Sequence, residues 1–192
     1  MIIDQWKEAF LRTLQVYENA GLLRAAALDE RLADWTAYLT EAVVHTCQSL
    51  GWMSAAKGNK LHILPVPHCE YLTLDVMAFA PTSARGWNFP VAVAELENSA
   101  NEERIAYSLW KVLCVRSDLR IVFCYRHSFA DAPTLVSYLG REVVASLTIE
   151  DRMNLKGETC LVIGSRNDSA TFPYYFFKWW PFDKNTGNFN VM

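Results

Sequence analysis

Apolar residues recur every three or four positions in four stretches of the chain, a spacing typical of amphipathic helices. We expect these helices at residues 3–20, 28–50, 102–116 and 133–153. Gly21 is expected to end the first helix. Asp29 and Glu30 are expected in the first turn of the second helix, where acidic side chains are favoured. Ser99 or Asn101 is suited to cap the third helix.

Short apolar runs bounded by turn-forming residues predict β-strands between these helices. Three follow one another as "LHILPVP" (61–67), "YLTLDVMAFA" (71–80) and "FPVAVAELEN" (89–98). A fourth, "LRIVFCYR" (119–126), is apolar throughout and is expected at the centre of a sheet. The remaining extended segments are "TCLVIGSR" (159–166) and "FPYYFFKWWPF" (172–182).

The order of these elements predicts the fold class. Three consecutive strands favour an antiparallel arrangement, and the later alternation of helix and strand favours parallel crossover connections. We therefore expect an α/β fold with a mixed β-sheet flanked by helices. The 192 residues suit a single domain, 1–192, with enough length to bury a core.

The composition narrows the class of protein. Hydrophobic residues make up 52% of the chain and charged residues 20%, which is typical of a globular protein. A net charge of −3 provides no overall basic field to attract nucleic acid. Five scattered cysteines without a CxxC pair predict neither a disulfide framework nor a zinc site. No membrane span and no signal peptide are expected, which indicates a cytoplasmic protein.

Two neighbouring strands carry acidic residues in unusual places. Asp75 is the only charged residue of its predicted strand, and Glu95 and Glu97 end the next strand two residues apart, on one side of it. If the two strands pair through the 81–90 loop, the three carboxylates converge. Such a cluster repels itself unless a cation binds, and carboxylate oxygens are the ligands that Mg²⁺ or Mn²⁺ prefers.

The helix–β–β–β–helix–β order, together with an Asp in the second strand and an acidic pair ending the third, resembles the PD-(D/E)xK nuclease superfamily. The resemblance covers residues 28–126 as a restriction-endonuclease-like core, with an N-terminal helix in 1–27 and a helix plus two extended segments in 127–192. It implies that Asp75 and Glu95 bind a divalent metal, Mg²⁺ or Mn²⁺, for hydrolysis of DNA or RNA. Glu97 stands where this family usually has a lysine that orients or activates water.

The missing lysine leaves several roles open. Glu97 is expected as a further metal ligand or as a group that positions water. In some members the lysine lies on the next helix, where this chain has Lys111. Lys111 is about two and a half turns from the start of that helix, roughly 15 Å along its axis, which favours an ordinary solvated lysine. Members often add a Glu from the preceding helix, and Glu41, one turn from His45, is the candidate or else an ordinary boundary residue.

Structural roles are the alternatives for the acids. Asp75 is then bonded to Arg85 or to a backbone amide at a strand end. Glu95 and Glu97 then provide negative charge outside the N-terminus of the following helix. The corresponding alternative function is a catalytically inactive nuclease-fold protein that acts as an interaction or scaffold subunit.

The C-terminal run "FPYYFFKWWPF" is apolar on both faces. Aromatic side chains of this kind stack on bases, but more often fill a core or an interface. We expect burial of the run, or a homodimer or partner subunit joined through it. A partner of this kind would supply the basic surface that a chain of net charge −3 lacks for binding nucleic acid.

Overall fold

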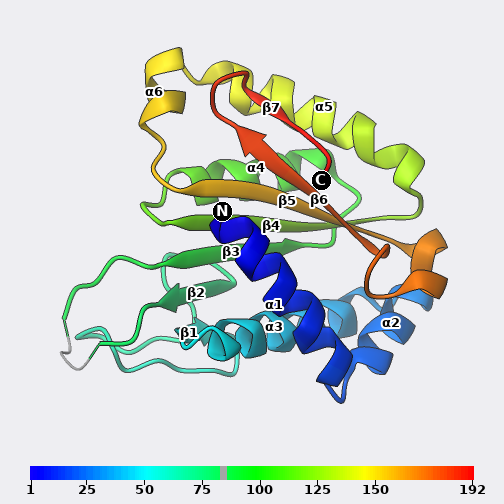
Figure 1. The fold of residues 1–192 in the computed structure, drawn as a ribbon, viewed down its shortest axis with the longest axis horizontal. Coiled ribbons are helices and arrows are strands. Elements are labelled where there is room, and N and C mark those ends of the chain that lie inside the picture. The colour runs from blue at the N-terminus through cyan, green and yellow to red at the C-terminus, as the bar shows by residue number, and fades with distance from the viewer. Residues whose placement is uncertain (83–85) are drawn as a thin grey trace.

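The computed structural model describes residues 1–82 and 86–192 as an α/β fold with a mixed seven-stranded sheet flanked by helices (Figure 1). The expected fold class is confirmed. The strands lie side by side in chain order: β1 (Met53–Ala56), β2 (Val76–Phe79), β3 (Ala92–Glu97), β4 (Leu119–Arg126), β5 (Glu158–Ser165), β6 (Phe177–Asp183) and β7 (Asn188–Phe189).

Six α-helices are found in the described residues, with three short 3-10 helices between them. The α-helices are α1 (Ile2–Val16), α2 (Ala20–Leu28), α3 (Leu32–Ser49), α4 (Glu102–Leu113), α5 (Ala132–Glu142) and α6 (Ile149–Asn154). The 3-10 helices are η1 (Phe129–Asp131), η2 (Val144–Ser146) and η3 (Arg166–Thr171).

Strand directions follow the predicted pattern. β1, β2 and β3 pair antiparallel, and β3, β4 and β5 pair parallel. The parallel pairs are joined by crossover connections, through α4 between β3 and β4 and through α5 and α6 between β4 and β5. β4 is central as expected, with parallel neighbours on both sides and seven of its eight residues buried.

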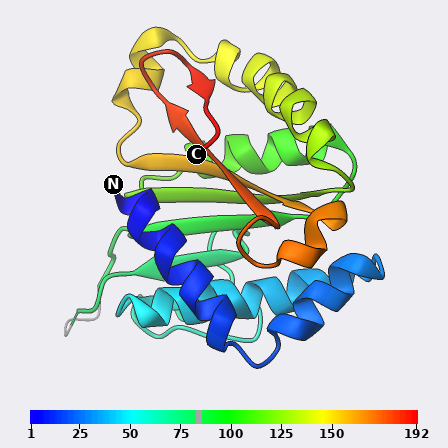
Figure 2. The ribbon, with the colours of Figure 1, turned by 45° about the vertical axis from the view of Figure 1, so that its right-hand side comes forward.

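Each face of the sheet has its own hydrophobic core. In β4, Ile121 and Phe123 point toward the core formed with α1, α2 and α3, whereas Val122 and Cys124 point toward the core formed with α4 and α5. Figure 1 shows α1 crossing in front of the sheet and α4 behind it, and the turned view in Figure 2 agrees. This division matters for the site, because it separates the side chains of α3 from those of α4.

The N-terminal helices differ from their expected bounds. A separate helix, α2, follows α1, so Gly21 lies inside a helix rather than after one. Asp29 and Glu30 form the turn between α2 and α3, not the first turn of α3, and Glu30 has a φ of 56°. The segment was missed because "AGLLRAAAL" is rich in alanine, which favours a helix without marking one apolar face.

The first two predicted strands were wrong in position. Residues 61–67 form a loop, and the edge strand is β1, which has only four small or unbranched residues. Leu72 and Thr73 have φ of 54° and 55°, a left-handed conformation that interrupts the second predicted strand. Asp75 therefore lies directly before β2 rather than inside it.

The predicted helix at 133–153 is divided into α5, η2 and α6. The division comes at Thr148, which caps α6. Its Oγ1 accepts a hydrogen bond from the Asp151 N–H at 3.0 Å, and the Asp151 carboxylate accepts in return from the Thr148 N–H at 3.3 Å. This reciprocal arrangement starts a new helix where the apolar spacing alone suggests continuation.

Part of the aromatic C-terminal run enters the core. Phe176, Phe177 and Trp179 are buried. The Phe177 ring lies 5.2 Å from the ring of Phe10 on α1, and Trp179 lies 6.0 Å from Trp6. The expected burial is therefore seen for part of the run, whereas Tyr174 and Tyr175 are exposed, and a homodimer or partner subunit through this segment stays a prediction.

Two other expectations concern cysteines and membranes. All five cysteines are free, and Cys47, Cys124 and Cys160 are buried, which raises the pKa of each of these thiols to about 12. Among the described residues, no helix has the length and apolar character needed to cross a membrane.

Candidate functional site at the ends of β2 and β3

β2 and β3 place Asp75 and Glu95 directly across from each other. Val76 pairs with Ala94 in the antiparallel register, Asp75 precedes the first of these residues and Glu95 follows the second. The Asp75 N–H donates to Glu95 Oε1 at 3.3 Å, and the Leu96 N–H donates to Asp75 Oδ2 at 2.7 Å. The two acids that the sequence singled out on separate strands are therefore in one network.

Lys111 of α4 joins this network and is not a solvated lysine. Its Nζ lies 2.7 Å from Glu95 Oε2 and donates to the Thr73 carbonyl at 2.9 Å, and its side chain is 17% exposed. The expectation of a solvated lysine was based on the distance of Lys111 from the start of its helix, roughly 15 Å. That distance does not say how close Lys111 lies to β3. α4 is the crossover helix between parallel strands, so it runs back along β3 and its later turns pass over the strand.

Two members of the network were not predicted. Ser108, buried on α4 one turn before Lys111, donates from Oγ to Glu95 Oε2 at 3.2 Å. Its three-residue spacing from Lys111 places both on one helix face and was the available signal. The Thr73 carbonyl gave no signal, because its position depends on the left-handed conformation of Leu72 and Thr73.

Glu97 lies on the same side of β3, but its carboxylate is engaged elsewhere. Its Oε1 accepts from the Ser99 N–H at 2.9 Å, and Arg104 Nε lies 3.4 Å from its Oε2. Ser99 is in the turn that leads to α4, whose cap is Asn101, with its side chain accepting from the Glu103 N–H at 2.8 Å. The contacts of Glu97 therefore resemble the alternative in which it supports the helix N-terminus.

Burial raises the pKa of both central acids. For Asp75, desolvation outweighs the hydrogen bond from the Leu96 N–H and the positive charge of Lys111, both of which lower the pKa. For Glu95, desolvation likewise outweighs the hydrogen bond from Lys111, and the charge of Asp75 raises the pKa further. The pair is thus held in an environment where its negative charge is costly and additional positive charge would be favourable.

A surface pocket of about 440 Å³ opens onto this network. Glu95, Glu97 and Lys111 line it, together with Arg104 and Tyr107 of α4. Tyr107 is exposed, and Lys111 Nζ lies 5.9 Å from the centre of its ring. Glu95 and Lys111 are therefore reachable from solvent along the outer surface of α4, whereas Asp75 is not among the residues that line this pocket.

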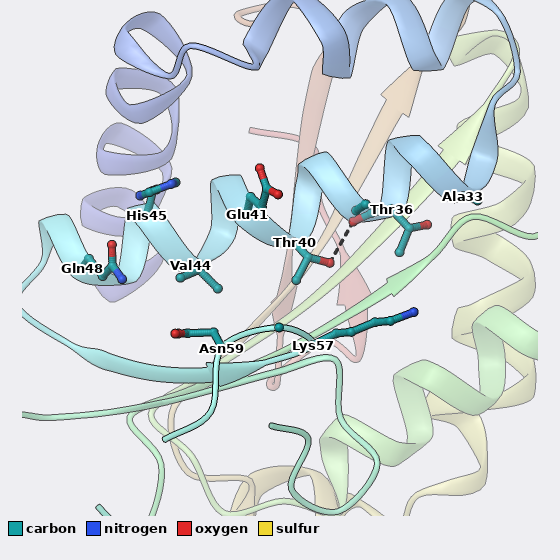
Figure 3. Close-up of a pocket in the computed structure, with 11 residues that line it drawn as sticks. Ala33, Thr36, Thr40, Glu41, Val44, His45, Gln48, Lys57 and Asn59 are labelled. Atoms are coloured by element: carbon teal, nitrogen blue, oxygen red, sulfur yellow. Dashed lines mark hydrogen bonds between the residues drawn. The ribbon is translucent and has the colours of Figure 1, made fainter. Parts of the chain in front are cut away.

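Glu41 is not part of this site. It lies on α3, which packs on the opposite face of the sheet from α4. Its Oε2 accepts hydrogen bonds from the Tyr17 hydroxyl and from Asn19 Nδ2. Glu41 lines a separate pocket of about 500 Å³ with His45, and Figure 3 shows both on α3, with the turn that carries Lys57 on the other side of the helix. The contacts of Glu41 are those of an ordinary boundary residue.

One structural alternative for Asp75 is observed and the other is not described. The backbone amide of Leu96 is the kind of strand-end donor that the alternative required. Arg85 lies outside the described residues. Of the other basic residues in the middle of the chain, Arg120 is buried and donates to the carbonyls of Val115 and Lys156, so it is not available to a ligand.

The donor set at Asp75 and Glu95 fits a divalent cation. Mg²⁺ and Mn²⁺ bind through one or two carboxylates and keep several waters. Asp75 Oδ1 accepts no hydrogen bond from the described residues, whereas both oxygens of Glu95 do. No group of three or more His, Cys, Asp or Glu is placed to hold a metal in the part of the chain that the structure describes, so the acids form a pair rather than the predicted trio.

Comparison with known proteins gives no assignment, since the chain matches no family model, no curated protein and no solved structure.

Proposed function

We propose that this protein is a Mg²⁺- or Mn²⁺-dependent nuclease that hydrolyses phosphodiester bonds of nucleic acid. The observation that carries this proposal is the Asp75–Glu95–Lys111 network. It brings together two carboxylates of raised pKa at the ends of neighbouring strands, buried Glu95 and half-buried Asp75, with one lysine of α4. These residues, in a helix–β–β–β–helix–β order, are what the resemblance to PD-(D/E)xK nucleases leads one to expect, with the lysine on the helix.

Each residue of the network has a chemical role in this proposal. Asp75 and Glu95 are the ligands of the cation. A divalent cation at this position supplies positive charge to the phosphate and makes water more acidic. Lys111 Nζ, held by the Thr73 carbonyl, provides a fixed positive charge beside Glu95 that orients water or stabilises the charged phosphate.

The surroundings of the pocket support a nucleic-acid substrate. Arg104 is exposed at its rim, where its Nε pairs with Glu97, and its other guanidinium N–H groups provide donors for phosphate. Tyr107 and Trp110 are exposed on the outer face of α4, with ring centres 6.0 Å apart. Exposed aromatic rings beside positive charges are suited to stacking on unpaired bases.

The carboxylate oxygens of Glu95 already have partners within the network, which favours a second candidate function, a catalytically inactive interaction or scaffold subunit. Glu95 Oε2 already has two partners, Lys111 and Ser108, and Glu95 Oε1 accepts from Asp75. A buried ion pair that satisfies itself in this way is able to serve the fold alone. The two candidates differ in whether the carboxylates accept a cation and support turnover.

A cleavage assay separates the two candidates. Single-stranded and double-stranded DNA and RNA are incubated with the purified chain and Mg²⁺ or Mn²⁺, and products are resolved by length. We expect cleavage of at least one substrate by the wild type. The rate is expected to fall by about 100-fold or more in Asp75→Asn, which removes a ligand of the cation, and in Lys111→Met, which removes a positive charge beside the reacting phosphate.

Lys60→Met is the matched control, since Lys60 is exposed and outside the network. Its activity should equal that of the wild type. Cleavage that persists in Asp75→Asn would place the activity elsewhere, and inactivity of the wild type on all four substrates would favour the scaffold.

A further inference from the structure

A second pocket, of about 560 Å³, lies between α5, α6 and the β6–β7 hairpin. Figure 1 shows these elements together at one end of the molecule, with β7 beside α5. Arg141 of α5 and Arg152 of α6 both line it, and none of the described lining residues is acidic. Although the chain has a net negative charge, two guanidinium groups and no described carboxylate line this pocket.

Arg152 is unusual within this pocket. Its Nε is buried and has no hydrogen-bond partner among the described residues. Its guanidinium lies against the backbone of Gly187, where any added Cβ would meet Arg152 Nη1. Gly187 has a φ of 77°, so a glycine both forms the hairpin turn and leaves room for the arginine. A buried guanidinium nitrogen without a partner is costly, which points to an acceptor that the protein chain does not supply.

The second arginine is presented to solvent at the rim. The side chain of Arg141 is 67% exposed, with its Cζ 5.4 Å from the ring centre of Tyr138. Its Nε lies 2.8 Å from Glu142 Oε1, an exposed pair that contributes little and leaves other guanidinium N–H groups available.

Neutral donors complete the lining. Ser137, Asn188 and Asn190 line the same pocket, and no hydrogen bond of these three side chains is found among the described residues. Apolar side chains of Val136, Val144 and Phe189 form the rest of the wall. The pocket therefore combines two cationic groups, several uncommitted donors and an apolar surface, which is the usual make-up of a small-molecule site.

We propose that this pocket binds a small organic phosphate, with the phosphate group between Arg141 and Arg152 and the organic part against the apolar wall. A phosphate monoester has three terminal oxygens and a charge near −2, so it uses more of the donors around the pocket than a carboxylate does. Arginine binds such groups with paired N–H donors. The proposal is independent of the nuclease proposal, because the two sites share no lining residue.

Calorimetric titration of the full chain with phenyl phosphate, inorganic phosphate and benzoate tests the proposal. Phenyl phosphate and benzoate carry the same ring, so their comparison isolates the anionic group. We expect saturable binding with phenyl phosphate tighter than either of the others. The affinity should fall by about tenfold or more in Arg152→Gln and in Arg141→Gln, since each removes charge-assisted hydrogen bonds.

Two further variants keep the test decisive. Gly140→Leu fills the pocket, because a Cβ at Gly140 has no atom within 4 Å and leucine favours the helix, so folding is retained while binding is lost. Arg12→Gln removes an arginine of α1 with the same 67% exposure as Arg141 and should not change binding.

Three results would overturn the proposal. The first is absence of saturable phenyl phosphate binding into the millimolar range. The second is equal or tighter binding of benzoate, which would assign the pocket to carboxylates. The third is an equal loss of affinity in Arg12→Gln and Arg141→Gln, which would show general charge attraction without a site.

Discussion

At the scale of single residues, the central feature is the burial of charge at Glu95. Glu95 is only 4% exposed, and Lys111 is its one positively charged contact among the described residues. Removal of one partner of such a pair leaves the other as an uncompensated buried charge, which costs more than the pair itself contributes. Stability measurements therefore report on the network separately from any catalytic role.

We expect Lys111→Met to lower the free energy of unfolding by about 2–3 kcal/mol near neutral pH, because ionised Glu95 then lacks its partner. The loss should shrink at about pH 4, where the unpaired carboxyl becomes protonated in the folded chain. Urea unfolding at both pH values checks this, with Lys60→Met as the unaffected control. A loss that is equal at both pH values would contradict the role of the Glu95 charge.

Asp75→Asn has the opposite expected effect on stability. Burial raises the pKa of Asp75 in the folded chain, so the folded state binds this proton more tightly than the unfolded state and loses stability as the pH rises through the raised pKa. The substitution keeps an acceptor for the Leu96 N–H and removes the charge. Thermal unfolding should show a gain of about 1 kcal/mol near neutral pH, because the substitution removes a charge that is costly to bury and that neighbouring carboxylates repel. The gain should vanish in acid, and a loss at neutral pH would contradict this account.

The sequence predicted part of this site. Asp75 and Glu95 stood out because acids are rare in and beside apolar strands, and antiparallel pairing brings such residues together. Lys111 was a candidate, but its contact with Glu95 was not predicted. The position of Lys111 along its helix does not give its distance from the neighbouring strand. The prediction that Glu41 belongs to the site was wrong, because the sequence does not reveal which face of the sheet its helix covers.

At the scale of elements, long apolar runs were predicted correctly, and the errors fell at a short strand and at a capped helix start. Strands β4 and β5 were predicted within about one residue, because long apolar runs leave few alternatives. β1 was missed because four residues are too few to show a period. The 133–153 helix was wrong because its interruption depends on the capping of Thr148, which apolar spacing does not reveal.

The turn before β5 provides a test of the parallel pair at the sheet centre. Gly157 has a φ of 75°, and a Cβ there would overlap the carbonyl oxygen of Asp118, which accepts the Glu158 N–H at 2.8 Å at the start of the β4–β5 ladder. Gly157→Ala should lower the free energy of unfolding by about 2 kcal/mol or more.

Gly58→Ala is the matched control for that substitution. Gly58 has a similar φ of 81° but no atom within 4 Å of an added Cβ. The loss of stability in Gly58→Ala should therefore reflect backbone strain alone, about 1 kcal/mol. Chemical denaturation of both variants gives the difference. Equal losses would show that the Asp118 carbonyl moves away without cost and that the turn does not fix the start of the ladder.

At the scale of the whole molecule, one sheet separates two cores, and both candidate sites lie on the same side of that sheet. Helices α1, α2 and α3 cover one face with the buried aromatic residues of β6, and α4 and α5 cover the other. The Asp75–Glu95–Lys111 network and the pocket lined by Arg141 and Arg152 both belong to the α4–α5 side. The order of elements predicts a mixed sheet flanked by helices. Which helices share a face of the sheet is seen only in the fold.

The C-terminal aromatic residues should contribute to stability according to their burial. Trp179→Ala should lower the free energy of unfolding by about 3–5 kcal/mol, as expected for loss of a buried tryptophan. Tyr175→Ala, at 69% exposure in the same segment, should change it by less than about 0.5 kcal/mol. Denaturation monitored by circular dichroism checks both. A small effect of Trp179→Ala would contradict its place in the core and would favour an interface role for the segment.

The central claim is that Asp75 and Glu95 share a divalent cation, and calorimetric titration with Mn²⁺ and with Mg²⁺ tests it most directly. The account predicts saturable binding by the wild type in the presence of nucleic acid, and loss of that binding in Asp75→Asn, which remains folded. Absence of binding by the wild type, or unchanged binding in Asp75→Asn, would contradict it.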